Sequence, residues 1–299
     1  MKNVRIAIAG NPNSGKTTLF NALTGSRQRV GNWPGVTVER IEGYYDHGET
    51  RIDVTDLPGI YSFSAYSIDE KVAREHILND KPELVVNIVD ATNVERNLFL
   101  TTQLLEMHVP LVVALSMSDV AKKRRIKIEI EHLARHLGCP VVPIVASKGK
   151  GLDELRDVIL ATAAEARPSP TRVQYDSELE KAIERLLARM GRAAADRSVD
   201  ARWLALKLLE KDDIAADLLD DDQVADLVAS ETKRVEVHTG EDLDIVIPTG
   251  ATGSSMVLPG TLCTGTAKCA RPCRTRSTRC SSTACSAYLS SWRSCTWSL

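Results

Sequence analysis

One stretch near the N-terminus restricts the fold of this chain more than any other: Gly10-Asn11-Pro12-Asn13-Ser14-Gly15-Lys16-Thr17. An apolar run at residues 4–9 precedes it and predicts a buried strand, and residues 18–23 after it have a helical pattern. This order of strand, glycine-bounded loop, Lys-Thr and helix is the arrangement of a phosphate-binding loop, or P-loop. A chance glycine-rich loop is the alternative, and the flanking strand and helix argue against it.

The chemistry of phosphate binding explains the residue types in this loop. Gly10 and Gly15 let successive backbone N–H groups approach phosphate oxygens, and the N-terminus of the following helix adds its positive dipole. We expect Lys16 to reach the β- and γ-phosphates and the Thr17 hydroxyl to bind Mg²⁺. The expected phosphate contacts run from the first glycine through both threonines: Gly10, Asn11, Pro12, Asn13, Ser14, Gly15, Lys16, Thr17 and Thr18.

Composition narrows the functional classes. The 299 residues suffice for one large or two ordinary domains, and the net charge of −2 does not favour a nucleic-acid partner. No apolar run is long enough to span a bilayer, and residues 1–3 lead into the first predicted strand without a signal-peptide pattern, so we expect a cytoplasmic chain that does not insert into lipid. Cys139 stands alone, and the other six cysteines, between Cys263 and Cys295, form no CxxC pair, so a zinc site is poorly supported.

The first half of the chain alternates between apolar runs and helical patterns. Predicted strands cover residues 4–9, 37–45, 51–55, 84–89, 111–115 and 141–145, and predicted helices cover residues 16–23, 69–79, 98–107, 128–136 and 152–164. This alternation is typical of an α/β fold with a mixed, mostly parallel six-stranded sheet and helices on both faces. Prolines in the linker at residues 167–170 end the pattern, and three to five amphipathic helices between residues 177 and 239 predict a small all-helical domain.

Two more segments are expected to surround the phosphates. Asp56-Leu57-Pro58-Gly59 follows a predicted strand. We expect Asp56 to be an outer-sphere ligand of Mg²⁺ and the Gly59 N–H to contact the γ-phosphate. Residues 30–37 are rich in glycine and proline and predict a mobile loop, in which Thr37 closes on Mg²⁺ and the γ-phosphate as a switch, next to Gly35 and Val36. For Trp33 in the same loop, a switch role and a partly buried anchor both stay open.

Two later loops are expected to bind the base. Ser116-Met117-Ser118-Asp119 stands where GTP-binding proteins carry N-K-x-D, so Asp119 is present to bind guanine, but Ser116 replaces the longer Asn. Ala146-Ser147-Lys148 follows the last predicted strand and offers a backbone N–H to the guanine carbonyl. Because guanine selectivity depends on satisfying its donors and acceptors, two interpretations stay open: an ordinary GTPase with a tolerated serine, or relaxed discrimination against ATP.

Three strings of residues together resemble a known family. The strings G-N-P-N-S-G-K-T-T, N-W-P-G-V-T-V-E and D-L-P-G-x-Y-S, followed by a helical segment, are similar to the cytoplasmic part of the ferrous iron transport protein B (FeoB) family. The resemblance covers residues 1–247 and implies two domains. The first is a Ras-like P-loop GTPase domain at residues 1–166, and the second is a helical domain at residues 167–247 that resembles a nucleotide-dissociation inhibitor.

The resemblance also implies roles for single residues. Asn13 and backbone carbonyls near Gly31 and Trp33 are expected to bind K⁺ beside the phosphates. Ile60 stands where Ras-like enzymes place a water-orienting glutamine, so we expect slow hydrolysis that depends on positioning, Mg²⁺ and K⁺. The residues expected to act in hydrolysis are Asn13, Lys16, Thr37 and Gly59.

Our functional hypothesis is a GTP-hydrolysing regulatory domain of a bacterial Fe²⁺ transporter, at the cytoplasmic face of the inner membrane. Its expected partners are the membrane domain of the same transporter and further copies of the chain. One alternative is a stand-alone GTPase of RNA modification or ribosome assembly, which the acidic helical segment argues against (Asp212, Asp213, Asp217, Asp220, Asp221 and Asp222). A second alternative is a binding switch with negligible catalysis. The histidines, including His47, His76 and His108, show no ligand spacing, so we expect no iron site.

Residues 248–299 differ from the rest of the chain. They contain no Asp or Glu and are rich in Cys, Ser, Thr and Arg, a bias that predicts an unstructured tail. A sharper hypothesis is a shifted reading frame, because one alternative offset decodes two stretches of this tail: the first then resembles the end of the cytoplasmic region of FeoB proteins, and the second the start of their membrane domain. Its cysteines would then be accidental, and DNA codons incompatible with that offset would exclude the idea.

Overall fold

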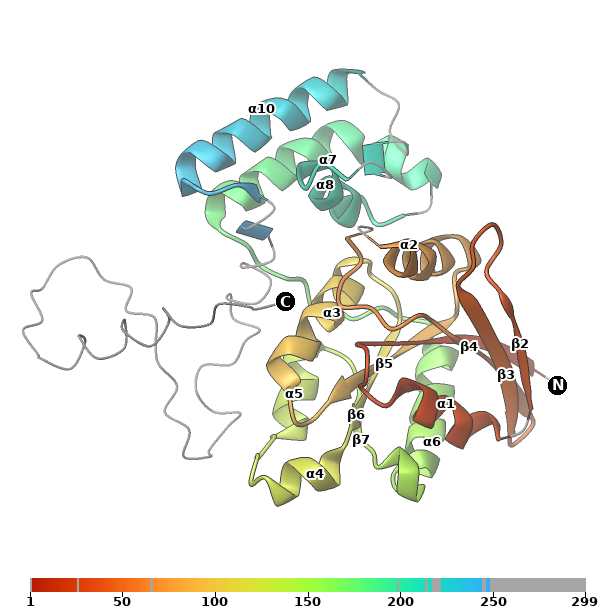
Figure 1. Ribbon diagram of the computed structural model, residues 1–299. Coiled ribbons are helices and arrows are strands. Elements are labelled where there is room, and N and C mark those ends of the chain that lie inside the picture. The colour runs from red at the N-terminus through yellow and green to blue at the C-terminus, as the bar shows by residue number, and fades with distance from the viewer. Residues whose placement is uncertain are drawn as a thin grey trace, which may run out of the picture. The chain divides into compact units, whose positions relative to one another are not determined.

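The computed structural model describes residues 2–25, 27–64, 67–197, 199–212, 215–216, 222–243 and 246–247 (Figure 1). All of them belong to one compact unit of the chain, Met1–Gly265. The prediction of an unstructured or frame-shifted tail at residues 248–299 lies outside the described residues.

A seven-stranded sheet forms the centre of the first domain. Its spatial order is β2-β3-β4-β1-β5-β6-β7, in which the five strands from β4 to β7 pair in parallel and β3 runs antiparallel to both of its neighbours. The strands are β1 Lys2–Gly10, β2 Gln28–Asn32, β3 Glu39–His47, β4 Thr50–Asp56, β5 Leu84–Asp90, β6 Leu111–Ser116 and β7 Val141–Pro143. The mostly parallel order places the carboxyl ends of β1, β4 and β6 at one edge of the sheet, where ligands of such folds bind.

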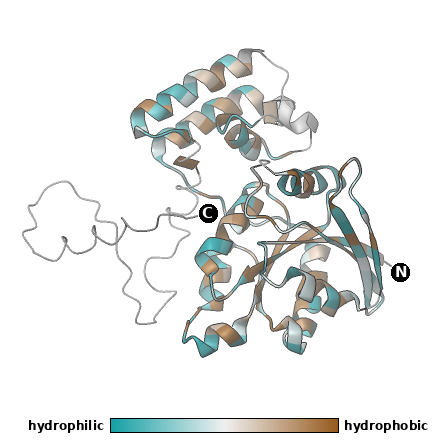
Figure 2. Cartoon of the chain, viewed as in Figure 1, coloured by the Kyte–Doolittle hydropathy of each residue, from teal (hydrophilic) through white to brown (hydrophobic). Residues whose placement is uncertain are grey.

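Helices cover both faces of the sheet (Figure 2), which explains why the central strands β5 and β6 are mostly apolar and are buried along almost their whole length. Alternate residues of β1 point to opposite faces: Ile6 and Ile8 belong to the apolar layer under α1 and α6, and Ala7 and Ala9 to the layer under α2, α3 and α5. The helices of this domain are α1 Lys16–Thr24, α2 Ile68–Glu75 with a π-helical continuation η1 His76–Asp80, α3 Val94–Glu106, α4 Ser118–Lys123, α5 Ile130–Leu137, the 3₁₀ turn η2 Ala146–Lys148, and α6 Leu152–Glu165.

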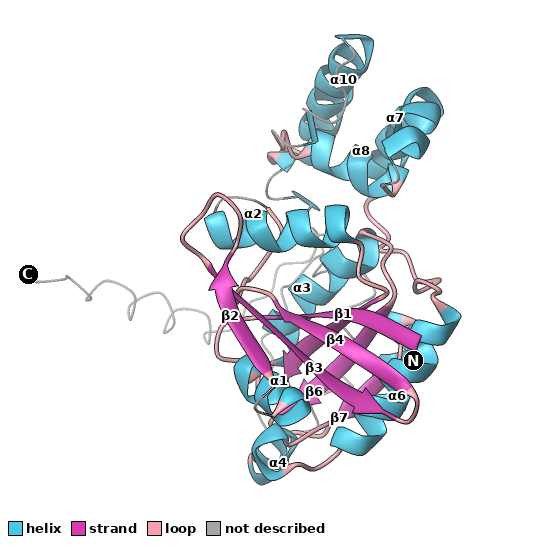
Figure 3. Ribbon diagram, turned by 90° about the vertical axis from the view of Figure 1, so that its right-hand side faces the viewer, coloured by secondary structure: helices cyan, strands magenta, loops and turns pink. Residues whose placement is uncertain are grey.

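The sheet has one strand more than the six that we predicted. The additional strand, β2, lies at the outer edge of the sheet and occupies the start of the segment that we interpreted as a mobile loop (Figure 3). Every residue of β2 is exposed, so no alternation of apolar and polar residues marks it in the sequence. Its strand conformation depends on backbone pairing with β3, from Gln28 opposite Gly43 to Asn32 opposite Glu39.

The second part of the described chain is helical. It contains α7 Ser177–Arg197, α8 Ala201–Leu209 and α10 Asp222–Thr239. Their apolar faces pack into one core through Leu179, Ile183, Leu186, Trp203, Leu206, Leu208, Leu209 and Val224, with Leu187, Leu227 and Val228 partly buried against it. Among the described residues, no helix is long and apolar enough to cross a membrane.

Candidate nucleotide-binding site

The P-loop lies where the sequence predicts it, between the end of β1 and the start of α1. Its backbone takes left-handed conformations at Asn13 (φ +63°) and Gly15 (φ +95°), which turn the chain tightly into the helix. A Cβ atom on Gly10 would lie 2.9 Å from Ser14 Oγ and 3.1 Å from the Ile88 carbonyl oxygen. Glycine at position 10 therefore permits the close approach of the loop to the neighbouring strand β5.

Several polar atoms of this loop are buried without a partner. The side-chain nitrogen and oxygen of Asn11 and the hydroxyl of Ser14 have no hydrogen bond within the described chain, and both residues are almost fully buried. Buried polar groups are normally paired, so an unpaired set at the N-terminus of a helix indicates that a ligand completes it. The donors available there fit an anion such as a nucleotide phosphate.

Lys16 and Asp56 form an ion pair at the same place. Lys16 Nζ lies 2.7 Å from Asp56 Oδ1, and both side chains are largely shielded from water. Burial raises the pKa of the Asp56 carboxyl, and the neighbouring Lys16 ammonium counteracts that rise. Such a buried carboxylate requires a cation. The oxygen donors of Asp56 and the Thr17 hydroxyl fit Mg²⁺, which prefers oxygen ligands.

The segment after Asp56 packs directly on the P-loop. The Ile60 N–H donates to the Gly10 carbonyl at 3.2 Å, and a Cβ on Gly59 would lie 3.3 Å from Pro12 Cα. The Ile60 side chain is only 2% exposed and belongs to the apolar core. Position 60 therefore contributes packing and a backbone hydrogen bond to this region.

The loop between β2 and β3 holds the remaining predicted phosphate contacts. Gly35 and Thr37 are exposed and Val36 is half-buried in the turn of the hairpin. Trp33 is 6% exposed, with the Arg40 guanidinium 4.7 Å from its ring centre and the His76 ring 5.1 Å away. Of the two interpretations left open for Trp33, this packing favours the buried anchor.

Two of the three residues predicted to bind K⁺, Gly31 and Trp33, take part in backbone pairing of the β2–β3 hairpin. Gly31 lies in β2 opposite Arg40 of β3, and the Trp33 carbonyl accepts the Val36 N–H at 3.3 Å. Asn13 is exposed in the P-loop. A K⁺ site built from these three residues therefore requires the β2–β3 loop to rearrange, and it stays a prediction.

Ser116 connects the base loop to the P-loop. Its Oγ donates to the Ser14 carbonyl at 2.6 Å, and the bond is buried. We expected the serine to have less reach than asparagine. The close approach of the end of β6 to the P-loop compensates for the shorter side chain.

The two predicted base loops are joined by an ion pair. Lys148 Nζ lies 2.5 Å from Asp119 Oδ2, and this hydrogen bond lowers the pKa of Asp119. Met117 has a left-handed backbone (φ +54°) at the start of α4, whereas Ala146 is half-buried and Ser147 exposed in η2. Asp119 is thus ionised and accepts a hydrogen bond from a cationic donor.

With this geometry established, comparison with known proteins identifies the family. A family model described as "Ferrous iron transport protein B" matches residues 4–159, and a second, described as "FeoB cytosolic helical domain", matches residues 175–250. The chain belongs to the ferrous iron transport protein B (FeoB) family. This family assignment confirms the resemblance seen in the sequence.

Individual FeoB proteins support the same assignment. The "Fe(2+) transporter FeoB" of Escherichia coli K12 is 46% identical over 216 residues, which cover 71% of this chain and 27% of that protein. A mutant of S. thermophilus NFeoB bound to GDP has a TM-score of 0.78 at 41% identity, over 83% of this chain and 95% of that one. An S. thermophilus NFeoB structure bound to GDP·AlF4⁻ has a TM-score of 0.72 at 41% identity, over 83% and 96% of the two chains.

These comparisons confirm the predicted fold class. The chain has the α/β P-loop GTPase fold with a mixed, mostly parallel sheet and a helical domain, although the sheet has seven strands. They do not support the alternative of a stand-alone GTPase that acts on RNA. The chain spans about a quarter of the length of the curated FeoB proteins that it matches, 27% for that of E. coli.

Sequence reasoning missed two side chains that hold the segment after Gly59 in this FeoB chain. The Gln103 side chain accepts the Phe63 N–H at 2.8 Å, and Arg74 Nη1 donates to the Phe63 carbonyl at 3.2 Å. Both lie on helices whose local pattern is only that of amphipathic segments. Nothing in the sequence near Phe63 indicates these distant contacts.

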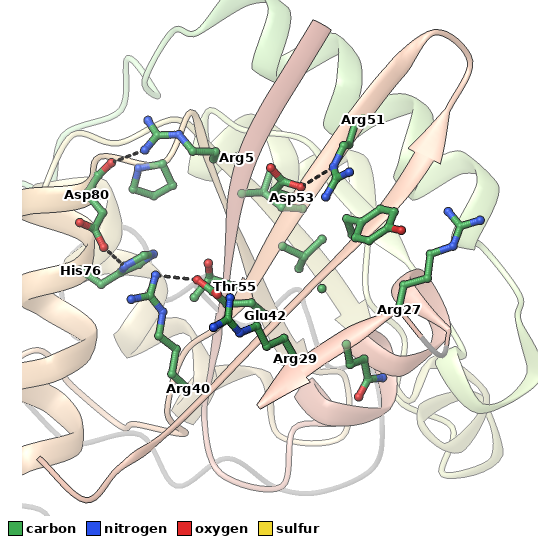
Figure 4. A pocket seen from close by; sticks show the side chains of 16 residues that line it. Arg5, Arg27, Arg29, Arg40, Glu42, Arg51, Asp53, Thr55, His76 and Asp80 are labelled. Carbon is green, nitrogen blue, oxygen red and sulfur yellow. Dashed lines mark hydrogen bonds and ion pairs between the residues drawn. The ribbon is translucent and has the colours of Figure 1, made fainter. Parts of the chain in front are cut away.

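A hollow of about 650 Å³ lies away from the P-loop of the FeoB domain (Figure 4). It is lined by five arginines of β1 to β4 and the segment before β2, and by none of the predicted nucleotide contacts. Four of these arginines are within ion-pair distance of a carboxylate: Arg5 of Glu83, Arg27 of Asp46, Arg40 of Glu42 and Arg51 of Asp53. This hollow is therefore a largely neutralised charged surface rather than the nucleotide site.

Proposed function

We propose that this chain binds GTP with Mg²⁺ and hydrolyses it to GDP and phosphate, as the nucleotide-controlled part of a longer Fe²⁺ transporter. The observation that carries the proposal is the P-loop with its unpaired buried Asn11 and Ser14 atoms, joined to the base loop through Ser116. The structures of S. thermophilus NFeoB with GDP and with GDP·AlF4⁻ support the choice of nucleotide and reaction.

In this proposal, the residues of the chain act mainly by positioning and by charge. Backbone N–H groups from Asn13 to Thr18 surround the phosphates, and Lys16 leaves Asp56 to contact the β- and γ-phosphates. Thr17, Asp56 and Thr37 would hold Mg²⁺, which supplies charge neutralisation at the transferred phosphate. Gly59 contributes a backbone N–H to the γ-phosphate, and no side chain at position 60 orients the attacking water, so hydrolysis is slow.

Guanine is the base that the loops fit best. Asp119 would exchange Lys148 for the N1 and N2 donors of guanine, with Met117 and the η2 residues Ala146 to Lys148 beside the ring. Ser116 keeps the base loop attached to the P-loop, so its replacement of asparagine does not loosen this connection. Selectivity for GTP over ATP follows from unpaired donors and acceptors that adenine would leave in this site.

The experiment is phosphate release from GTP and ATP, compared in KCl and NaCl at equal ionic strength. We expect slow GTP hydrolysis that K⁺ accelerates, because Asn13 would bind K⁺ beside the phosphates once the loop with Gly31 and Trp33 closes. Comparable ATP hydrolysis would contradict GTP selectivity. Equal rates in KCl and NaCl would contradict the proposal that Asn13 binds K⁺ during hydrolysis.

A variant and a second kinetic measurement sharpen this test. Asp119→Asn should weaken GTP binding strongly and leave ATP turnover at its background value, because only guanine presents two donors to this carboxylate. Single-turnover hydrolysis distinguishes an enzyme from a binding switch. Tight GTP binding without phosphate release over hours would favour the switch without catalysis.

The cellular role is part of the same proposal. The chain would act at the cytoplasmic face of a bacterial inner membrane, with the membrane portion of the longer FeoB protein as its partner and with further copies of itself. The 27% coverage of the E. coli transporter supports the existence of such a larger protein. Fe²⁺ uptake by cells that carry the full-length gene with Asp119→Asn tests the role, and unchanged uptake would contradict it.

A further inference from the structure

Two histidines on α5 face one another at the spacing of a metal chelate. His136 is four positions after His132, so the two lie on the same side of the helix, one turn apart. Their Nε2 atoms are 3.2 Å apart, and the ring centres are 4.4 Å apart with an interplanar angle of 65°. We expected no ligand spacing among the histidines, and that expectation overlooked this pair.

The distance between the two nitrogens matches metal coordination. Two imidazole nitrogens at about 2.0–2.1 Å from one ion lie about 2.9 Å apart at a right angle and about 3.4 Å apart at a tetrahedral angle. The observed 3.2 Å lies between these values. Both nitrogens could therefore bind one ion with small rotations of the rings, whereas in its absence one Nε2–H donates to the other nitrogen.

The surroundings leave this pair available. Both rings are half-buried on α5, while Leu133 and Leu137 of the same helix turn into the core and hold it in place (α5 in Figure 1). Within the described part of the chain, neither histidine forms an ion pair with a carboxylate. The pair is thus presented on a packed helix, so little order has to be gained when an ion binds.

We propose that His132 and His136 form a binding site for one divalent first-row transition-metal ion. Two neutral imidazoles favour Fe²⁺, Co²⁺, Ni²⁺, Cu²⁺ or Zn²⁺ over Mg²⁺, which prefers oxygen ligands. Among the described residues, no third His, Cys, Asp or Glu joins the pair, so water fills the remaining positions of the ion. An ion held in this way exchanges readily, and the site responds to the free metal concentration. This site is separate from the proposed GTPase function and does not depend on it.

The test is calorimetric titration of the full chain, free of nucleotide and Mg²⁺, with NiCl₂. The variants are His132→Gln and His136→Gln, and the matched control is His238→Gln, which removes one exposed histidine from α10. We expect a saturable site in the parent chain whose affinity falls at least tenfold in either α5 variant and stays unchanged in the control. The cysteines are identical in all four proteins, so binding to thiols cancels in the comparison.

Thermal unfolding gives a second readout that does not depend on activity. Because the two nitrogens approach one another only when α5 is helical, Ni²⁺ should raise the melting temperature of the parent chain and of the control, and not that of either α5 variant. Melting curves without metal show whether each variant is folded. Absence of saturable Ni²⁺ binding by the parent, or equal binding by all four proteins, would overturn the proposal.

Discussion

Ser116 is a short side chain in a place where a longer one was expected. Its hydroxyl reaches the Ser14 carbonyl because the end of β6 approaches the P-loop closely. Both residues are almost completely buried, so water cannot replace the bond. The consequence is a direct connection between the loop that should contact the base and the loop that should contact the phosphates.

Replacing Ser116 with alanine tests this connection. Ser116→Ala leaves the Ser14 carbonyl without its donor, and we expect it to lower the free energy of unfolding by about 1–3 kcal/mol and to weaken GTP binding. Urea unfolding and titration with a fluorescent GTP analogue measure the two effects. Ser118→Ala is the matched control, because the Ser118 hydroxyl donates to the nearby Leu115 carbonyl of β6 and not to the P-loop. Equal GTP affinity of both variants would contradict a specific role for Ser116.

Glu106 is a buried carboxyl at the end of α3 that is outside the nucleotide site. Burial raises its pKa to about 8; Lys207 lowers it and Glu210 raises it further. The Tyr175 hydroxyl donates to Glu106 Oε1. Around neutral pH, Glu106 therefore carries its proton in the folded chain, whereas an unfolded glutamate is ionised.

This difference predicts that stability falls as pH rises. Between the unfolded pKa of about 4.3 and the folded pKa of about 8, only the folded chain binds the proton, so raising the pH favours unfolding. Glu106→Gln keeps an acceptor for Tyr175 and removes the titration. We expect the melting temperature of the parent to decrease more steeply between pH 6 and pH 8 than that of Glu106→Gln. Parallel curves would show that Glu106 is ionised in the folded chain.

The start of α2 shows how one capping residue fixes an element. Ser67 precedes the helix in an extended conformation, and its side chain accepts the Glu70 N–H at 3.2 Å. Glu70 also accepts the Ser62 hydroxyl at 3.0 Å. The first turn of α2 is therefore tied to the segment after Gly59.

Substitution at Ser67 measures the contribution of the cap. Ser67→Ala should lower the free energy of unfolding by about 1 kcal/mol, because the Glu70 N–H loses its acceptor at the helix N-terminus. Ser67→Gly also lacks the hydroxyl, but it lets water reach the Glu70 N–H, so we expect it to cost only about a few tenths of a kcal/mol. Urea unfolding of the three proteins provides the comparison, and identical stability of the parent and Ser67→Ala would exclude a capping role.

An ion pair connects distant parts of the chain. Arg74 on α2 is completely buried, and its Nη1 lies 2.6 Å from Asp212 Oδ2, beyond the end of α8. The same nitrogen donates to the Phe63 carbonyl, so one guanidinium contacts both the segment after Gly59 and the helical part. Removal of one member of such a buried pair leaves the other charge without compensation.

The Arg74–Asp212 ion pair predicts that a single conservative substitution lowers the free energy of unfolding strongly. Asp212→Asn removes the charge with little change of shape, and we expect it to lower the free energy of unfolding by about 3–5 kcal/mol. The double variant Arg74→Met, Asp212→Asn has no uncompensated charge and should recover part of this loss. Urea unfolding of the single and double variants measures both. A double variant less stable than Asp212→Asn would contradict the explanation.

Much of the fold could be predicted because it has local signals. The P-loop lies between a strand and a helix as its sequence requires, and each of the six predicted strands overlaps an observed one with both ends within two residues. The edge strand β2 and the short helix α4, Ser118–Lys123, were missed. Neither has an apolar period, since β2 is exposed and α4 has only Ala121 buried. Their conformation depends on pairing with β3 and on the end of β6.

In the candidate site too, some features follow from the sequence alone and others depend on the tertiary structure. The residue types and spacing of Gly10 to Thr17, Asp56 to Gly59, and Asp119 are properties of the sequence itself, because phosphate and guanine binding require those groups in that order. Only the tertiary structure decided that Ser116 reaches Ser14, that Trp33 is buried beside Arg40, and that Lys16 pairs with Asp56. Such contacts depend on how closely separate strands and loops approach one another. That separation is set by packing of the whole core, and no local pattern encodes it.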